Sequence, residues 1–500
     1  MPAIQPSTPQ RIAWAILIAL TLYVCYFSHL DVIGFVGPDE PRYAWIARDM
    51  AESGDWITPR LYGKPWFEKP PLLYWGGAIF FKLLGEDHPE TAARLPSAIS
   101  ALLATLALAW LAWRTYGEEC ARWLLLLLPT SIGMIGFSHA AATDMPFAGM
   151  LTIAVVCAAV VLGLVPPTQN TPVLPRTPWL ALLLFGFFLG LAVLAKGPAG
   201  IILIGGSVFF WALFTKRWRD TLRFLHPAAI AAFCFTALPW YILCARRNPD
   251  FFRIFIIEHN FKRYLTPEFQ HIQPFWFYIP ILLIALLPWT LPLSAVAIWQ
   301  GRRLTRMRQV QPISVLVITW TLFVILFFTI SRSKLPGYVL PALPVVAMLG
   351  ARVFSDAPLL PRRVSQSILV TLTIPIVLAI ASCSPFVHQR YLDSRSARPI
   401  AHMLEKGVPK LDRLRVFEIT RSEQYGLNFY LRQEIPSWLG HEIRDGYVLT
   451  DRKYCDSLHT EDTCEDLWGR SNFSASGASA LLKITPRDSL GGSSAGRQPQ

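Results

Sequence analysis

The chain has 500 residues, of which 53% are hydrophobic and only 16% are charged, and its formal net charge is +13. Soluble domains carry about 25% charged residues, so this composition and the mean hydropathy of +0.39 favour a membrane protein. In so apolar a chain, basic residues usually orient loops and meet anionic lipid headgroups. No basic stripe interleaved with aromatic residues lies on a polar segment, which argues against nucleic-acid binding.

Apolar runs close to the ~20 residues needed to cross a bilayer recur along the chain. The first run has no small-residue cleavage site after it, so we interpret it as an uncleaved span rather than a signal peptide. The proline-rich residues 166–178 are interpreted as a hinge between two groups of helices. About eleven spans are expected, at residues 12–32, 95–113, 122–138, 145–165, 179–195, 199–215, 226–244, 275–299, 313–330, 337–353 and 365–384.

Two short basic loops set the expected orientation. Residues 216–223 and 302–308 hold several Lys and Arg with little acid, which predicts a cytoplasmic position for both. Counting spans from them places the N-terminus inside, and residues 33–94 and the chain after 385 outside. Polar residues from distant parts of the chain then meet on the external side, whereas random placement would scatter them over both faces. They are Asp39, Glu40, Glu68, Lys69, Asp144, Lys196, Glu258, His259, Arg263 and Lys334.

This mixture of charges is typical of a site for a lipid-linked sugar phosphate. The phosphate needs cations at the membrane surface, for which Lys69, Arg263 and Lys334 are candidates. An acceptor hydroxyl needs a carboxylate base, and Asp39 and Asp144 are the candidates. Phosphate can itself leave when cations neutralise its developing charge. No Walker A loop and no GxGxxG fingerprint occur, so no nucleotide is expected.

The proposed catalytic and phosphate-binding residues also have structural alternatives. Asp39 could cap a helix over residues 41–53, and Asp144 could cap the span that it opens. Lys69 could be a snorkelling anchor of the membrane surface. For Lys196, which precedes Gly197 and Pro198, we prefer the interpretation of a break between two spans.

Three further candidates remain open between function and structure. Tyr338 could donate a hydrogen bond to phosphate or belong to the aromatic belt of the interface. Glu68 and His259 could hold a divalent metal, but no third ligand is visible, and a structural role is preferred for His259.

The last hundred residues differ from the rest in composition. Residues 386–486 are expected to form a small extracytoplasmic α/β unit, and residues 487–500 a disordered tail. Within the unit, a helix is expected at 398–406, with strands at 414–419 and 447–450. Cys455 and Cys464 could form a disulfide if the unit is extracytoplasmic.

A series of motifs connects these candidates to a known family. DEPRYAWIARDMAESGDW, FEKPPLLYW, ATDMPF, IEHNFKRYL, QPFWFYIP and SKLPGYVLPALP follow one another in this order. With them the chain resembles the GT-C glycosyltransferases of the protein O-mannosyltransferase and aminoarabinose transferase (ArnT) type, over nearly all of residues 12–385. The resemblance implies an all-α polytopic membrane domain in residues 1–385, with about 11–13 transmembrane helices, followed by the small α/β unit.

The resemblance also implies an activity. It is the inverting transfer of a sugar from an undecaprenyl-phosphate-type donor, on the periplasmic side of a bacterial inner membrane. Lipid A or another envelope lipid is the first acceptor, and protein Ser/Thr hydroxyls are the second. A lipid-linked sugar transporter is the alternative of another class, but it should show polar sites on both faces or internal repeats. A non-catalytic scaffold would leave the clustering of charges unexplained.

The resemblance assigns roles residue by residue. The catalytic carboxylates would be Asp39 and, near the acceptor, Asp144. The donor phosphate would be held by Lys69, Arg263 and Tyr338, beside the chemically plausible Lys334. In the aminoarabinose branch a divalent metal would bind Glu68 and His259, and the first motif adds Glu40, Arg42 and Tyr43 as candidates for substrate contact.

Overall fold

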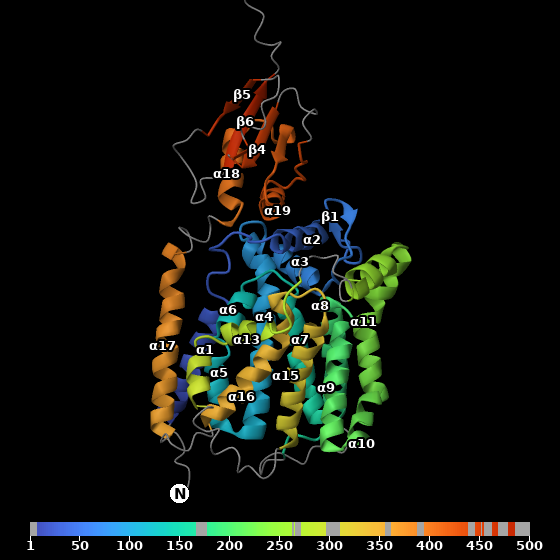
Figure 1. Ribbon diagram of the computed structural model, residues 1–500, viewed down its shortest axis with the longest axis vertical. Helices are drawn as coiled ribbons and strands as arrows, with labels where there is room; N and C mark the ends of the chain where they lie inside the picture. Colours follow the sequence, from blue (N-terminus) through green and yellow to red (C-terminus); the bar gives the residue numbers. More distant parts are fainter. Residues whose placement is uncertain are drawn as a thin grey trace, which may run out of the picture.

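The computed structural model of the chain is a helical bundle that carries a small α/β unit at one end (Figure 1). It describes residues 8–166, 178–262, 265, 272–296, 311–355, 362–387, 395–438, 446–451, 453–454, 463–468 and 479–485. Several expectations therefore lie outside the described residues: the hinge between residues 167 and 177, the basic loop at 302–308, Arg263, Cys455, the side chain of Cys464, and the tail.

Every expected span coincides with a helix or with a bent pair of helices. Among the described residues, seven helices are long and apolar enough to cross a membrane, and nine do so if each bent pair is one span. The two remaining expected spans fall on α9 and α17, whose described apolar stretches are shorter. The bundle consists of α1 (Thr8–Tyr26), α4 (Pro89–Tyr116), α5 (Glu118–Leu127), α6 (Ile132–Ser138), α7 (Asp144–Val161), α8 (Trp179–Lys196), α9 (Ala199–Thr215), α11 (Pro227–Arg247), α13 (Tyr278–Ala285), α15 (Pro312–Ile330), α16 (Leu343–Ser355) and α17 (Arg362–Val387).

Two of the expected spans are bent rather than straight. The pair α5 and α6 bends by 60°, and α13 bends by 101° against the helix Thr290–Val296. Prolines lie at both breaks, where the missing N–H interrupts the helical ladder. The two breaks bind each other, because the indole of Trp289 donates to the hydroxyl of Thr130 at 2.8 Å and the amide of Ile132 donates to the carbonyl of Leu287 at 2.9 Å.

Short elements close the two ends of the bundle. At the end below α9 lie α10 (Trp218–Thr221) and the 3₁₀ turn η1 (Leu222–Leu225). The opposite end carries α2 (Asp39–Ser53), the hairpin β1 (Arg60–Leu61) and β2 (Lys64–Pro65), α3 (Leu72–Leu84), the π-helix η2 (Arg253–Lys262) and the 3₁₀ helix η3 (Pro336–Ala342). Figure 1 shows α2 lying across this end of the bundle, as expected for an interfacial helix.

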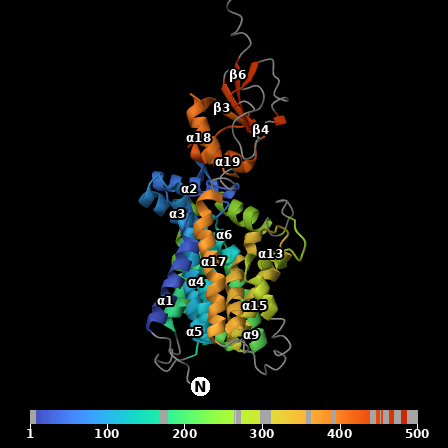
Figure 2. The ribbon, with the colours of Figure 1, turned by 90° about the vertical axis from the view of Figure 1, so that its left-hand side faces the viewer.

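The C-terminal unit contains the elements expected from its sequence and, in addition, a second α-helix and two further strands. It comprises α18 (Arg398–Gly407), β3 (Leu414–Phe417), α19 (Arg421–Tyr430), β4 (Gly446–Asp451), β5 (Thr463–Asp466) and β6 (Ser479–Thr485). The strand order is β3-β4-β6-β5, with β3 parallel to β4 and the other two pairs antiparallel. Figure 2 shows α18 and α19 between this sheet and α2.

A buried network joins the C-terminal unit to the bundle. Tyr430 donates to the carboxylate of Glu90 at 2.7 Å, and its hydroxyl accepts from the amide of Phe35 at 2.8 Å. The guanidinium of Arg398 binds the same carboxylate at 3.2 Å and the carbonyl of Val32 at 2.7 Å. The unit is therefore held against the segment that leads into α2.

Candidate functional site

The first turn of α2 holds a cation between two acids. The buried guanidinium of Arg42 donates to the carboxylate of Asp39 and, at 3.2 Å, to Oε2 of Glu68. Burial alone would lower the pKa of Arg42, but the charges of Glu68 and Asp39 raise it, so the guanidinium stays protonated. Asp39 keeps 53% of its side chain exposed. A carboxylate is thus fixed in position on one side and open to a substrate on the other.

Asp39 is not the helix cap considered as its structural alternative. The helix begins at Asp39 itself, Pro38 occupies the cap position, and no side chain caps the helix. The carboxylate is used instead in the ion pair with Arg42.

The Glu-Lys-Pro-Pro segment lies beside this cation. Nζ of Lys69 is 3.9 Å from Oε1 of Glu68, and each side chain is only 12% exposed. The preceding Phe67 is buried in an apolar cluster with Leu194 of α8 and Phe255 of η2. This cluster brings the segment next to the end of α8 and to the helix that carries His259.

Glu68 and His259 do not fit a divalent metal in this arrangement. The two oxygens of Glu68 face Arg42 and Lys69, which already compensate its charge. Among the residues that the structure describes, no group of three His, Cys, Asp or Glu is placed to hold a metal. Metal ligands normally come in threes or fours, so the described surroundings of Glu68 and His259 do not make a metal site.

A second ion pair joins α7 to α8 at the same end of the bundle. Nζ of Lys196 donates to Oδ1 of Asp144 at 2.6 Å, with the two side chains 10% and 21% exposed. The ammonium group also lies 4.5 Å from the ring centre of Tyr338. A Cβ on Gly337 would overlap the Asp144 carboxylate, so the glycine allows η3 to approach it closely.

At this pair, the cap interpretation of Asp144 is wrong, and the break interpretation of Lys196 is right but incomplete. Asp144 is the first residue of α7, but no side chain caps that helix. Lys196 does end α8, as the break interpretation predicts, yet it also neutralises Asp144. Its location at the end of an apolar span was the only local signal of this role, because its partner is 52 residues away.

Lys334 is a buried cation of a different kind. Its side chain donates to the carbonyl of Ser331 at 2.8 Å. Burial and the neighbouring Arg332 lower its pKa. Within the described part of the chain, no carboxylate lies at ion-pair distance from it. An anion bound here would supply the missing compensation.

Glu40 and Tyr43 of the first motif make their described contacts within the protein. The carboxylate of Glu40 accepts from Arg94 at 2.9 and 3.1 Å, and from the amides of Val36 and Ala141 at 2.9 and 2.7 Å. Tyr43 is buried and packs on Tyr74. Both residues therefore hold α2 in place, because their side chains are directed into the protein.

One site residue has no signal in the sequence. The ring of Tyr425, on α19 of the C-terminal unit, lies 5.1 Å from the guanidinium carbon of Arg42. A cation over an aromatic face is favourable, so the C-terminal unit contributes directly to holding the cation that binds Asp39 and Glu68.

Several known proteins are similar to this chain in sequence. The family model of dolichyl-phosphate-mannose-protein mannosyltransferase matches residues 12–255. The undecaprenyl phosphate-alpha-4-amino-4-deoxy-L-arabinose arabinosyl transferase of Aeromonas salmonicida is 31% identical over 346 residues, 67% of this chain and 58% of that protein. The protein of the same name from Pseudomonas aeruginosa is 32% identical over 346 residues, 68% of this chain and 59% of that protein. The chain thus spans less than two thirds of the length of these relatives.

The solved structures extend the likeness to the whole fold. The crystal structure of ArnT from Cupriavidus metallidurans bound to undecaprenyl phosphate superposes with a TM-score of 0.72, at 20% identity, over 97% of this chain and 99% of that one. The chain is an ArnT- and PMT-like protein of the GT-C fold. It is a multi-pass membrane protein, and the expected fold class is confirmed. The roles of the individual site residues in this ArnT-like chain stay predictions.

Proposed function

We propose that this chain is an inverting membrane glycosyltransferase that moves one sugar from a polyprenyl-phosphate carrier to an acceptor hydroxyl, with an envelope lipid such as lipid A as the first acceptor. The observation that carries the proposal is the half-exposed carboxylate of Asp39, held by buried Arg42 at the end of the bundle that also gathers Lys69 and Lys334. The similar proteins from Aeromonas salmonicida and Pseudomonas aeruginosa are named as arabinosyl transferases of an undecaprenyl phosphate-linked sugar. Their names support a polyprenyl-phosphate sugar as the donor.

The chemistry follows from these positions. Asp39 accepts the proton of the acceptor hydroxyl, and the hydroxyl oxygen forms a bond to the anomeric carbon from the face opposite the phosphate. The bond from that carbon to the phosphate oxygen breaks, and its electron pair stays on the carrier phosphate. Lys334 and Lys69 stabilise the charge that develops there. Asp144, whose charge is compensated by Lys196, orients the acceptor molecule.

The proposed orientation places this end of the bundle in the periplasm of a bacterial cell, with the protein in the inner membrane. The basic segment 216–223 supports it, because Figure 1 shows α10 at the end opposite α2, and short basic loops favour the cytoplasm.

The test compares the envelopes of a deletion strain complemented with wild type, Asp39→Asn or Asp250→Asn, by mass spectrometry of total lipids and extracytoplasmic glycoproteins. Asp250 is a matched control, since it lies just before η2 and its side chain is 70% exposed. A sugar-sized mass restored by wild type and Asp250→Asn but not by Asp39→Asn would support the proposal and identify the acceptor. Full restoration by Asp39→Asn would refute the catalytic assignment, and an unchanged glycoconjugate pool would refute transfer.

A further inference from the structure

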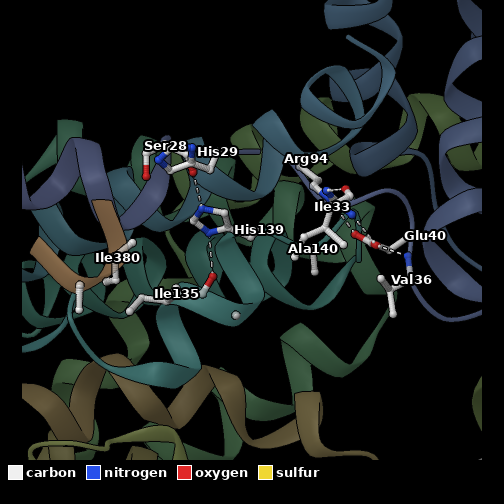
Figure 3. A pocket seen from close by; sticks show the side chains of 12 residues that line it. Ser28, His29, Ile33, Val36, Glu40, Arg94, Ile135, His139, Ala140 and Ile380 are labelled. Carbon is white, nitrogen blue, oxygen red and sulfur yellow. Dashed lines mark hydrogen bonds and ion pairs between the residues drawn. The ribbon is translucent and has the colours of Figure 1, made fainter. Parts of the chain in front are cut away.

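A cavity of about 660 Å³ lies beside the first turn of α2, and the ion pair of Glu40 with Arg94 forms part of its wall. Its volume falls in the range of roughly 300–1,000 Å³ that is usual for ligand sites. Figure 3 shows it between the segment after α1, helix α6 and helix α17. Its lining is mostly apolar and includes Val36, Ile135, Gly136, Ala140, Ala379 and Ile380.

The charged wall of the cavity is fully compensated. The guanidinium of Arg94 donates to both oxygens of Glu40 and to the carbonyls of Leu30, Ile33 and Gly34, which uses all five of its N–H groups. No charge on this wall is left to bind a phosphate. An apolar ligand therefore suits the cavity better than a charged headgroup.

The ring of His139, one of the two histidines that line the cavity, is likewise occupied. Figure 3 shows the ring of His139 between two carbonyl groups. Its Nε2 lies 2.9 Å from the carbonyl oxygen of Ser28 and its Nδ1 2.9 Å from that of Ile135. The imidazole is fixed by the protein and forms a rigid wall.

The cavity is open to the surroundings of the bundle. Gly136 and Ala379, which line it, are both exposed, and Val36 is 41% exposed. Only 17% of the apolar window of the neighbouring α1 is buried inside the protein. In a membrane these surfaces meet lipid, so a hydrocarbon chain can enter without crossing a polar barrier.

We propose that this cavity binds one acyl chain of the acceptor lipid. The inference rests on the proposed function and locates one hydrocarbon chain of its acceptor in the protein. Glu40, in the cavity wall, directly follows Asp39 in α2. The side chains of consecutive helical residues point about 100° apart. A lipid with one chain beside Glu40 thus presents its headgroup at the turn of α2 that carries the Asp39 carboxylate.

Gly136 lines the cavity and has room for an added Cβ. A Cβ added there meets no heavy atom within 4 Å. Gly205, on α9, is the matched control, because it is also helical, exposed and open, and it does not line the cavity. Gly136→Leu and Gly205→Leu therefore make the same chemical change, but only the first reduces the space for a chain.

The experiment uses the full chain in phosphatidylcholine nanodiscs and photo-crosslinking, which needs no turnover. Three probes carry a diazirine in the hydrocarbon part: lipid A, phosphatidylglycerol and undecaprenyl phosphate. We expect the lipid A probe to label residues 135–140 and 379–380, and unlabelled lipid A to compete. Gly136→Leu should reduce labelling about tenfold, the loss expected when roughly two methylene groups leave the site, whereas Gly205→Leu should match wild type.

Three results would overturn the inference. They are equal labelling by phosphatidylglycerol that lipid A does not displace, preferential labelling by undecaprenyl phosphate, and labelling that Gly136→Leu leaves unchanged. A parallel transfer assay separates this failure from that of the proposed function. Transfer to lipid A with no labelling of the cavity would refute only the proposed acyl-chain site. Labelling of the cavity without any transfer would refute only the proposed activity.

Discussion

The ammonium group of Lys196 lies 2.6 Å from the carboxylate of Asp144, which joins the last residue of α8 to the first residue of α7. Both side chains are largely withdrawn from solvent. Removing one partner of such a pair leaves an uncompensated charge, and this costs more than the pair itself contributes.

Lys196→Met should therefore destabilise the protein by about 3–5 kcal/mol and reduce transfer. The midpoint of thermal unfolding in one detergent, together with the transfer rate, checks this. The double variant Lys196→Met/Asp144→Asn should recover most of the stability, and Lys64→Met, at an exposed lysine of β2, should change neither quantity. A single variant as stable as wild type would contradict the assignment.

Gly337→Ala should reduce kcat while the protein stays folded. The added methyl group would overlap the Asp144 carboxylate and displace it from its position, and a misplacement of about 1 Å can cost roughly 100-fold in rate. Single-turnover kinetics at saturating donor would measure the loss. Gly205→Ala, where a Cβ meets nothing within 4 Å, is the control. Unchanged kinetics would show that the position of Asp144 does not matter for the chemical step.

Tyr425 should contribute to activity through its ring. Tyr425→Leu removes the aromatic face next to Arg42, a contact of about 0.5–2 kcal/mol, so kcat/KM should fall several-fold. Tyr425→Phe keeps the ring and should retain activity. If both variants behaved alike, the hydroxyl or the fold of α19 would be responsible instead.

The affinity for the donor should depend on pH through the protonation of Lys334. Burial and Arg332 lower its pKa below the ordinary value of 10.5. As pH rises through this lowered value, Lys334 loses its proton and the affinity for the donor phosphate should fall. The stability of the free protein should rise over the same window, because the unfolded chain still binds the proton there. Calorimetric titration with undecaprenyl phosphate checks the first trend, and Lys334→Arg, which stays protonated, should lose it.

The spans could be predicted from the sequence because the bilayer imposes a local rule. A helix that crosses hydrocarbon needs a run of about 20 apolar residues. This pattern located α7 and α8 to within a few residues and α1 and α4 less closely. The same rule does not register the bends at Thr130 and Trp289, since a bent pair keeps the composition of a straight span. Those bends are stabilised by contact with each other.

The functional site likewise has a part that could be predicted from the sequence and a part that could not. Its charged residues could be listed from the sequence, because acids and bases next to apolar spans are costly unless they serve a purpose. Their partners could not be listed. Asp39 pairs with Arg42 within one helical turn, but Asp144 pairs with Lys196 and Arg42 meets Tyr425 only after distant helices pack together.

The sequence by itself thus determined the membrane class, the spans and the motif residues, since each depends on neighbours along the chain. The tertiary structure alone decided that the carboxylate of Glu40 binds Arg94. It also decided that no carboxylate among the described residues lies at ion-pair distance from Lys334, and that an apolar cavity opens beside α2. These properties depend on distances between segments. A single sequence does not encode such distances in any local pattern, because burial and packing select the partners.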